Sequence, residues 1–179
     1  TLFANKTMTY TESRFIYPQI PVLTKLQDLT KNGKRFGSTE GSAIESNFAT
    51  WYGFYDVAGY DALYPKRVGE LVWAAHREGD FEWDYPRSTV VSPTVKNNWR
   101  DRFWMLAGVK WILHKDGNVN LAKRGHNSSL FEEDRFRLVW SEGKWQIYEN
   151  LLAFPRAFFI DDPSWIGEGP DMIRKIYSD

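Results

Sequence analysis

The 179-residue chain contains no cysteine, no surplus of either charge and no long apolar run. The lack of cysteine excludes a disulfide scaffold, a thiolate zinc site and a cysteine nucleophile. Lysine plus arginine number 23, as do aspartate plus glutamate, so the chain lacks the basic excess that nucleic-acid binders normally carry. The longest apolar runs are short, such as residues 104–107 and 157–160, whereas a membrane helix needs about 20 residues. We therefore expect no nucleic-acid partner and no membrane-spanning helix within this sequence.

The composition is that of an ordinary folded domain with many aromatic residues. Hydrophobic residues make up 42% of the chain and charged residues 26%, which is typical of a globular protein with a core. Aromatic residues reach 17%, and nine of them are tryptophan. The sequence starts at Thr1 without a signal-peptide pattern. Such a start is more typical of a domain excised from a larger protein than of a whole gene product.

Apolar residues spaced three and four apart predict several helices. The first helix begins at Pro21 and closes at Asn32-Gly33, and the second follows Pro65 and ends near Gly79. Two more are expected over about residues 97–107 and from Pro170 to Tyr177, with a proline-containing loop at 80–95.

Short apolar stretches bounded by turn residues predict strands at 34–37, 109–114, 136–140, 145–148 and 157–160. The turn at Ser141–Lys144 joins two of them into a hairpin. The aromatic stretch 48–64 is expected to be an ordered loop with short extended pieces. Together these elements predict an extended lead-in over residues 1–20. A single α+β domain should follow over residues 21–179, with helices packed on a mixed sheet of about five strands.

Residue patterns that often mark catalytic sites are incomplete here. The three histidines, His76, His114 and His126, lie far apart in sequence and lack the spacing of metal ligands. The Gly/Ser-rich stretch 37–47 lacks the Lys-Ser/Thr pair of a P-loop. Carboxylate pairs that a glycosidase would need sit in no recognisable motif; they are Asp56 with Asp61, Glu40 with Glu45, and Glu132 with Glu133. We predict no catalytic residue, no metal site and no cofactor.

The segment 47–61 is the most informative stretch for function, because aromatic rings alternate there with asparagine and aspartate. A sugar site uses this combination, since rings stack on the apolar face of a pyranose while polar groups bind its hydroxyls. Two other interpretations remain open. The rings could fill the core, with Gly53 and Gly59 supplying turns, or they could anchor a protein interface.

Six segments, in order along the chain, form a pattern that is shared with a known family. They are Lys34-Arg35-Phe36-Gly37, Asn47 with Tyr52-Gly53, residues 59–67 (GYDALYPKR), residues 106–113 (LAGVKWIL), Tyr148-Glu149-Asn150 and residues 154–158 (FPRAF). In this order they resemble the extracytoplasmic soluble part of YfhO-like proteins and related GT-C-type glycosyltransferases, which are polytopic membrane proteins that use lipid-linked sugar donors. Trp111 stands where the family usually has tyrosine, and Phe154 where leucine is common.

The resemblance implies a domain on the extracytoplasmic face of a bacterial or archaeal cytoplasmic membrane. In GT-C enzymes the catalytic carboxylate lies in a loop between membrane helices, so this domain is expected to be non-catalytic. Its implied partners are the membrane helices of its own full-length protein, and a glycan or lipid-linked sugar. Its implied role is to bind the glycan or acceptor, or to close over the membrane-embedded site.

The residues that we expect to contact a ligand are Asn47, Trp51, Tyr52, Tyr60, Asp61, Arg67 and Arg156. An arginine could pair with the phosphate of a lipid-linked sugar or with a carboxylated glycan. The structural alternative is that Arg67 and Arg156 form ion pairs with Asp61 or Glu149 and hold the loop on the sheet. The functional alternatives are a stand-alone carbohydrate-active hydrolase that uses Asp56 and Asp61, or an envelope protein-interaction module.

Overall fold

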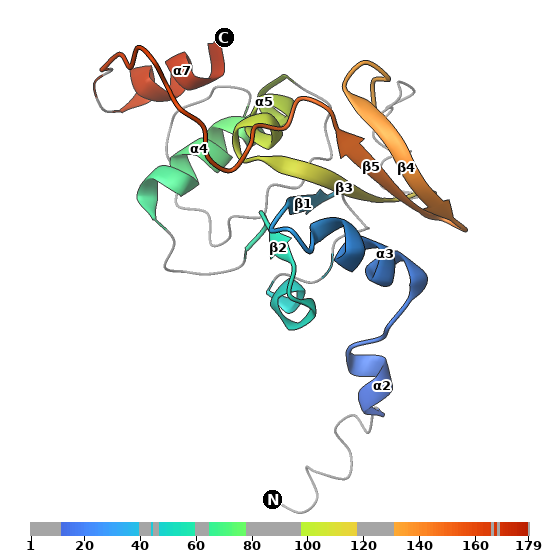
Figure 1. Ribbon diagram of the computed structural model, residues 1–179. Helices are drawn as coiled ribbons and strands as arrows, with labels where there is room; N and C mark the ends of the chain where they lie inside the picture. The colour runs from blue at the N-terminus through green and yellow to red at the C-terminus, as the bar shows by residue number, and fades with distance from the viewer. Residues whose placement is uncertain are drawn as a thin grey trace, which may run out of the picture.

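The computed structural model describes residues 12–39, 44, 47–59, 65–77, 98–117, 131–165, 167 and 169–178. A five-stranded mixed sheet, with the order β2-β1-β3-β5-β4, forms its centre (Figure 1). β1 pairs in parallel with β2 and β3, while β5 pairs antiparallel with β3 and β4. This confirms the expected α+β fold with a mixed sheet. The strands are β1 (Arg35–Ser38), β2 (Tyr55–Asp56), β3 (Val109–Lys115), β4 (Phe136–Glu142) and β5 (Trp145–Asn150).

The helices are α2 (Ser13–Ile16), α3 (Pro21–Thr30), the 3-10 helix η1 (Phe48–Tyr52), α4 (Lys66–Arg77), α5 (Asn98–Leu106) and α7 (Pro170–Ser178). Four of the helices, α3, α4, α5 and α7, lie where the periodicity predicts them, whereas α2 and η1 were not predicted and η1 lies in the stretch 48–64 that was expected to be a loop. The segment expected as an extended lead-in contains α2, which projects away from the sheet (Figure 1). The strand expected at 157–160 is wrong, because these residues form neither helix nor strand. The loop expected at 80–95 lies outside the described residues.

Apolar side chains pack on both faces of the sheet. Successive side chains of a strand point to opposite faces, and accordingly Ile112 and Leu113 of β3 belong to two different clusters. One cluster joins the sheet to α4 and α5, and the other joins it to α3 and the η1 region. Leu26 and Trp104 are almost fully buried, and burial of each such side chain stabilises the fold by about 2–3 kcal/mol.

Two glycines shape the turns around β3 and β5. Gly108 ends α5 with φ of 65°, and its N–H donates to the carbonyl of Met105 at 3.1 Å. Gly143 has φ of 59° in the tight turn between β4 and β5. Both positions lie in the left-handed region that only glycine enters at little cost. The positive φ lets the chain leave α5 directly into β3.

A buried ion cluster lies at the start of α5. Arg100 and Asp101 are both 3% exposed, and the Arg100 Nε donates to Asp101 Oδ1 at 2.8 Å. Arg135, just before β4, reaches the other carboxylate oxygen at 3.2 Å. Burial lowers the pKa of Arg100, although the Asp101 carboxylate opposes that shift. The cluster ties α5 to the segment that precedes β4.

None of the helices in the described part of the chain has the length and apolarity that would be needed to span a membrane.

Candidate ligand-binding site

An apolar pocket of about 250 Å³ opens between η1, the segment that leads into α3, and the sheet. We call it the η1 pocket. Residues from five separate segments line it, which explains why sequence spacing alone does not reveal it. The lining side chains include Ile16, Pro18, Ile20, Leu23, Phe48, Tyr52, Leu113 and Trp145.

Tyr52 fixes the wall of the η1 pocket. Its ring stacks on Phe54 with centroids 5.4 Å apart, and its hydroxyl donates to the carbonyl of Pro18 at 3.1 Å. Gln27 of α3 donates to the Tyr52 carbonyl at 3.3 Å. Burial, reinforced by neighbouring Tyr17, raises the pKa of Tyr52, so its phenol stays neutral. These contacts hold η1 against both the lead-in segment and α3.

Trp51 does not line the pocket, but it is the neighbour of Tyr52 in η1 and presents an exposed ring. Its ring stacks on Tyr17 at a centroid distance of 4.2 Å and an interplanar angle of 13°. Phe48, which lines the pocket, lies 5.6 Å from the same Tyr17 ring. Trp51 is nevertheless 65% exposed. A ring that is held in place yet remains open to solvent can stack on a bound molecule.

Asn47 has a backbone role at the start of η1. It has φ of 73°, the one positive φ among the described non-glycine residues, and it precedes the first turn of the 3-10 helix. Asparagine enters this left-handed region more readily than most residues. Its carbonyl accepts from the N–H of Thr50 at 3.3 Å. Asn47, Trp51 and Tyr52 are therefore brought together by one short helix.

The other residues expected in the site do not join this group. Tyr60 and Asp61 lie outside the described residues. Arg67 is exposed on α4, where its Nη1 lies 3.8 Å from the sulfur of Met172. Arg156 donates to the carbonyl of Gly33 at 2.9 Å and lies over the ring of Tyr55.

Arg156 therefore fastens the segment after β5 to the turn after α3 and to β2. The expected alternative of an Arg156–Glu149 ion pair is wrong, because Glu149 pairs with Lys110 and Arg137. The Arg67–Asp61 pair rests on a residue outside the described part.

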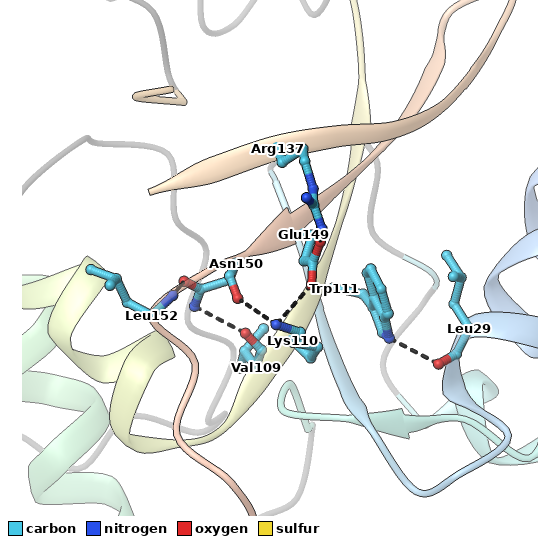
Figure 2. Close-up of polar contacts among 8 residues, drawn as sticks. All are labelled: Leu29, Val109, Lys110, Trp111, Arg137, Glu149, Asn150 and Leu152. Atoms are coloured by element: carbon cyan, nitrogen blue, oxygen red, sulfur yellow. Dashed lines mark hydrogen bonds and ion pairs between the residues drawn. The ribbon is translucent and has the colours of Figure 1, made fainter. Parts of the chain in front are cut away.

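Several residues that carry the family resemblance form hydrogen bonds and ion pairs within the fold (Figure 2). Lys110 reaches Glu149 Oε1 at 2.9 Å, and Arg137 donates to the other oxygen of the same carboxylate. Burial alone would raise the pKa of Glu149, but hydrogen bonds from Lys110 and Arg137 outweigh burial and hold that pKa below its usual value. The carboxylate is thus ionised and fixed between β3, β4 and β5.

Asn150 and Trp111 extend this set of contacts around Glu149, which we call the framework. The amide of Asn150 donates to the Val109 carbonyl at 3.0 Å and accepts from the Leu152 N–H at 3.1 Å. The Trp111 indole donates to the carbonyl of Leu29 in α3 at 2.9 Å (Figure 2). These residues hold the sheet, α3 and the chain after β5 together.

Asp56 is the one strongly perturbed carboxylate among the described residues. Burial raises its pKa to about 6, although hydrogen bonds from the Ala58 and Val57 backbone N–H groups partly oppose this shift. Ala58 donates to Asp56 Oδ1 at 2.9 Å. Asp56 therefore closes its own turn after β2. The second carboxylate of the hydrolase alternative, Asp61, lies outside the described residues.

The buried His114 is a second titratable group that the sequence patterns did not single out as functional. Its Nδ1 lies 2.8 Å from the hydroxyl of Thr39, and both side chains are buried. Burial lowers the pKa of His114. Because this hydroxyl–imidazole pair is buried, it ties the residue that follows β1 to β3 and does not face a substrate. Within the described residues, no group of three or more His, Asp or Glu side chains could hold a metal ion.

No protein-family model matches the chain, and no curated protein or solved structure is significantly similar to it. The resemblance to YfhO-like and GT-C-type proteins therefore stays a prediction from the sequence.

Proposed function

We propose that this chain is a non-catalytic binding domain of a larger multi-pass membrane protein of the lipid-linked-sugar glycosyltransferase type. In this proposal it faces the extracytoplasmic side, and its η1 pocket receives the glycan acceptor or the lipid-linked sugar. The observation that carries the binding role is the exposed Trp51 ring, which is fixed against Tyr17 and lies next in the chain to Tyr52 of the apolar pocket. The membrane context rests on the sequence resemblance alone.

The chemistry of the pocket favours the apolar part of such a ligand. Its walls are aliphatic and aromatic side chains, and the Tyr52 hydroxyl is already bonded to Pro18. An isoprenoid chain would bury apolar surface against these walls, which yields roughly 25 cal/mol for each Å² removed from water. The exposed Trp51 ring would then stack on the first sugar.

Calorimetry with farnesyl phosphate and, separately, with glucosyl farnesyl phosphate tests the proposal. We expect both probes to bind. Trp51→Ala should weaken only the sugar-bearing probe, by about three- to tenfold, which is the loss typical of one aromatic contact. Trp165→Ala is the matched control, because Trp165 is 93% exposed and lies in the segment between β5 and α7. The proposal fails if neither probe binds, or if Trp51→Ala binds glucosyl farnesyl phosphate like the unchanged chain.

A second candidate function follows from exposed apolar side chains in the segment between β5 and α7. Phe159 is fully exposed and Trp165 nearly so, and Phe158 and Ile160 are more than half exposed. Apolar groups gathered on a surface mark interaction sites, so this segment supports a protein-interaction module. Co-sedimentation with the full-length protein, compared between the unchanged chain and its Phe159→Asp variant, would test this second function. Association that is unchanged by Phe159→Asp would contradict it.

A further inference from the structure

A lysine ammonium lies against one wall of the η1 pocket. The described side chains that line the pocket are all uncharged, and Trp145 is one of them. The Nζ atom of Lys115 lies over the Trp145 ring, 5.0 Å from its centroid. A cation in this position is attracted to the electron-rich face of the indole. Lys115 does not itself line the pocket, so its position relative to the pocket has to follow from the strand register.

The register puts Lys115 on the same face of the sheet as the η1 pocket. Lys115 is directly opposite Trp145 in the antiparallel ladder of β3 and β5, and Leu113 is directly opposite Ile147. Side chains of directly opposite residues project to the same face, and so do side chains two residues apart in one strand. Because Leu113 and Trp145 both line the pocket, Lys115 shares their face. Its ammonium therefore lies at the Trp145 end of the pocket.

The Lys115 ammonium is able to take an anionic partner. Its side chain is half-buried, and it forms no ion pair within the described part of the chain. An ammonium carries three N–H donors, and the contact with the Trp145 ring orders the side chain without giving those donors an oxygen acceptor. The neighbouring Asp116 carboxylate accepts from the N–H of Gly117 at 2.7 Å. The η1 pocket thus combines apolar walls with an ordered cation beside one of them.

We propose that Lys115 binds the phosphate group of an isoprenoid phosphate whose chain fills the η1 pocket. This inference rests on the proposed function and adds the head group that the site selects. A phosphate monoester carries a charge of about −1.5 to −2 at pH 7 and offers strong acceptor oxygens, and hydrogen bonds between two charged groups are stronger than neutral ones. A chain that ends in a hydroxyl gains no such contact. The site should therefore prefer an isoprenoid phosphate to the corresponding alcohol.

Glu142 supplies an internal control for the electrostatic part of this inference. It is exposed and lies directly opposite Trp145 in the ladder of β4 and β5. Glu142, Trp145 and Lys115 therefore form one row on the same face, with Trp145 in the middle. The Glu142 carboxylate repels a phosphate at Lys115, and salt screens this repulsion. Removal of the Glu142 charge should strengthen phosphate binding, whereas removal of the Lys115 charge should weaken it.

Calorimetry on the full chain, with farnesyl phosphate, farnesol and inorganic phosphate as separate probes, tests the inference. We expect farnesyl phosphate to bind more tightly than farnesol, and inorganic phosphate to bind more weakly than farnesyl phosphate. Lys115→Gln should weaken farnesyl phosphate binding by about five- to thirtyfold, the loss of a hydrogen bond to a charged group at a half-buried site. It should leave farnesol binding unchanged. Glu142→Gln should strengthen farnesyl phosphate binding by about two- to threefold at low salt.

Two control variants show whether the effect belongs to the charge at position 115. Lys115→Arg keeps the positive charge and should keep the preference for farnesyl phosphate over farnesol. Lys66→Gln removes an exposed lysine of α4, a helix that packs on the other face of the sheet, and should bind both probes like the unchanged chain. Thermal unfolding of each variant shows whether the domain is intact.

The outcomes distinguish this inference from the proposed function. If neither farnesyl phosphate nor farnesol binds, the proposed function fails and the inference fails with it. If both bind equally well, or if Lys115→Gln keeps the preference for the phosphate, the inference alone is overturned. Inorganic phosphate that binds as tightly as farnesyl phosphate overturns it as well, because the anion would then bind without the pocket. If Lys115→Gln does not fold, unchanged farnesyl phosphate binding in Glu142→Gln contradicts the inference.

Discussion

Gly108 allows a quantitative test of what the turn between α5 and β3 requires. Its φ of 65° already strains any residue with a Cβ, and an added Cβ would lie 3.1 Å from the carbonyl oxygen of Phe154. Phe154 cannot retreat easily, because its own N–H donates to Met105 at 3.0 Å. Gly143 has a similar φ of 59°, but no atom lies within 4 Å of an added Cβ. Comparison of the two glycines separates backbone strain from steric conflict.

Gly143→Ala should lower the free energy of unfolding by about 1 kcal/mol, the cost of a left-handed conformation for an L-residue. Gly108→Ala carries the same strain and adds about 1–3 kcal/mol for overpacking against a fixed carbonyl. The total of about 2–4 kcal/mol corresponds to a fall in Tm of about 4–16 °C, compared with about 2–4 °C for Gly143→Ala. Urea unfolding followed by circular dichroism measures both free energies.

Asparagine variants sharpen the same test. Asparagine tolerates the left-handed region better than alanine does, so Gly143→Asn should cost less than Gly143→Ala. Gly108→Asn keeps the Cβ near Phe154 and should remain clearly destabilised. Equal losses for the two alanine variants would refute the steric part of the reasoning. A Gly108→Asn variant as stable as the unchanged chain would refute it as well.

Three further predictions concern buried polar groups. Because burial raises the pKa of Asp56 to about 6, the unchanged chain should lose about 1–3 kcal/mol of stability as the pH rises from about 4 through 6. Asp56→Asn should abolish that loss in urea unfolding at several pH values. Because burial lowers the pKa of His114, stability should fall as the pH drops below about 6.5, and thermal scans of His114→Gln should lack this acid branch. Asn150→Asp places a carboxylate against the Val109 carbonyl and should cost about 2–4 kcal/mol at pH 7, measurable by urea unfolding.

The elements that the sequence predicts well are those with local signals. Pro21 begins α3, and the apolar spacing that follows it places Leu26 in the core. Gly143 lies in the turn of the predicted hairpin, and Gly108 ends the predicted third helix. In each case the decisive residue lies within the element itself, so local propensity and the global fold agree.

The predictions that fail depend on contacts between distant segments. Residues 157–160 are apolar enough for a strand, but none of the strands in the described residues pairs with them, and Phe159 is fully exposed. An ion pair between Arg156 and Glu149 was one alternative, but the Arg156 guanidinium donates to the carbonyl of Gly33 instead. No sequence pattern marks the backbone carbonyl of Gly33 as an acceptor for Arg156. Likewise, no sequence pattern shows that five separate segments come together to form the η1 pocket.

The framework around Glu149 bears on what a family resemblance can say about ligands. Lys110 and Asn150 match the pattern of the resemblance, and Trp111 stands where that pattern has tyrosine. Each of the three bonds to a described backbone group inside the fold. Selection for these contacts would preserve the fold whatever the domain binds. The ligand is therefore better sought among exposed side chains outside this framework, such as Trp51. If proteins that share the framework bind different ligands, such exposed positions should vary while the framework stays fixed.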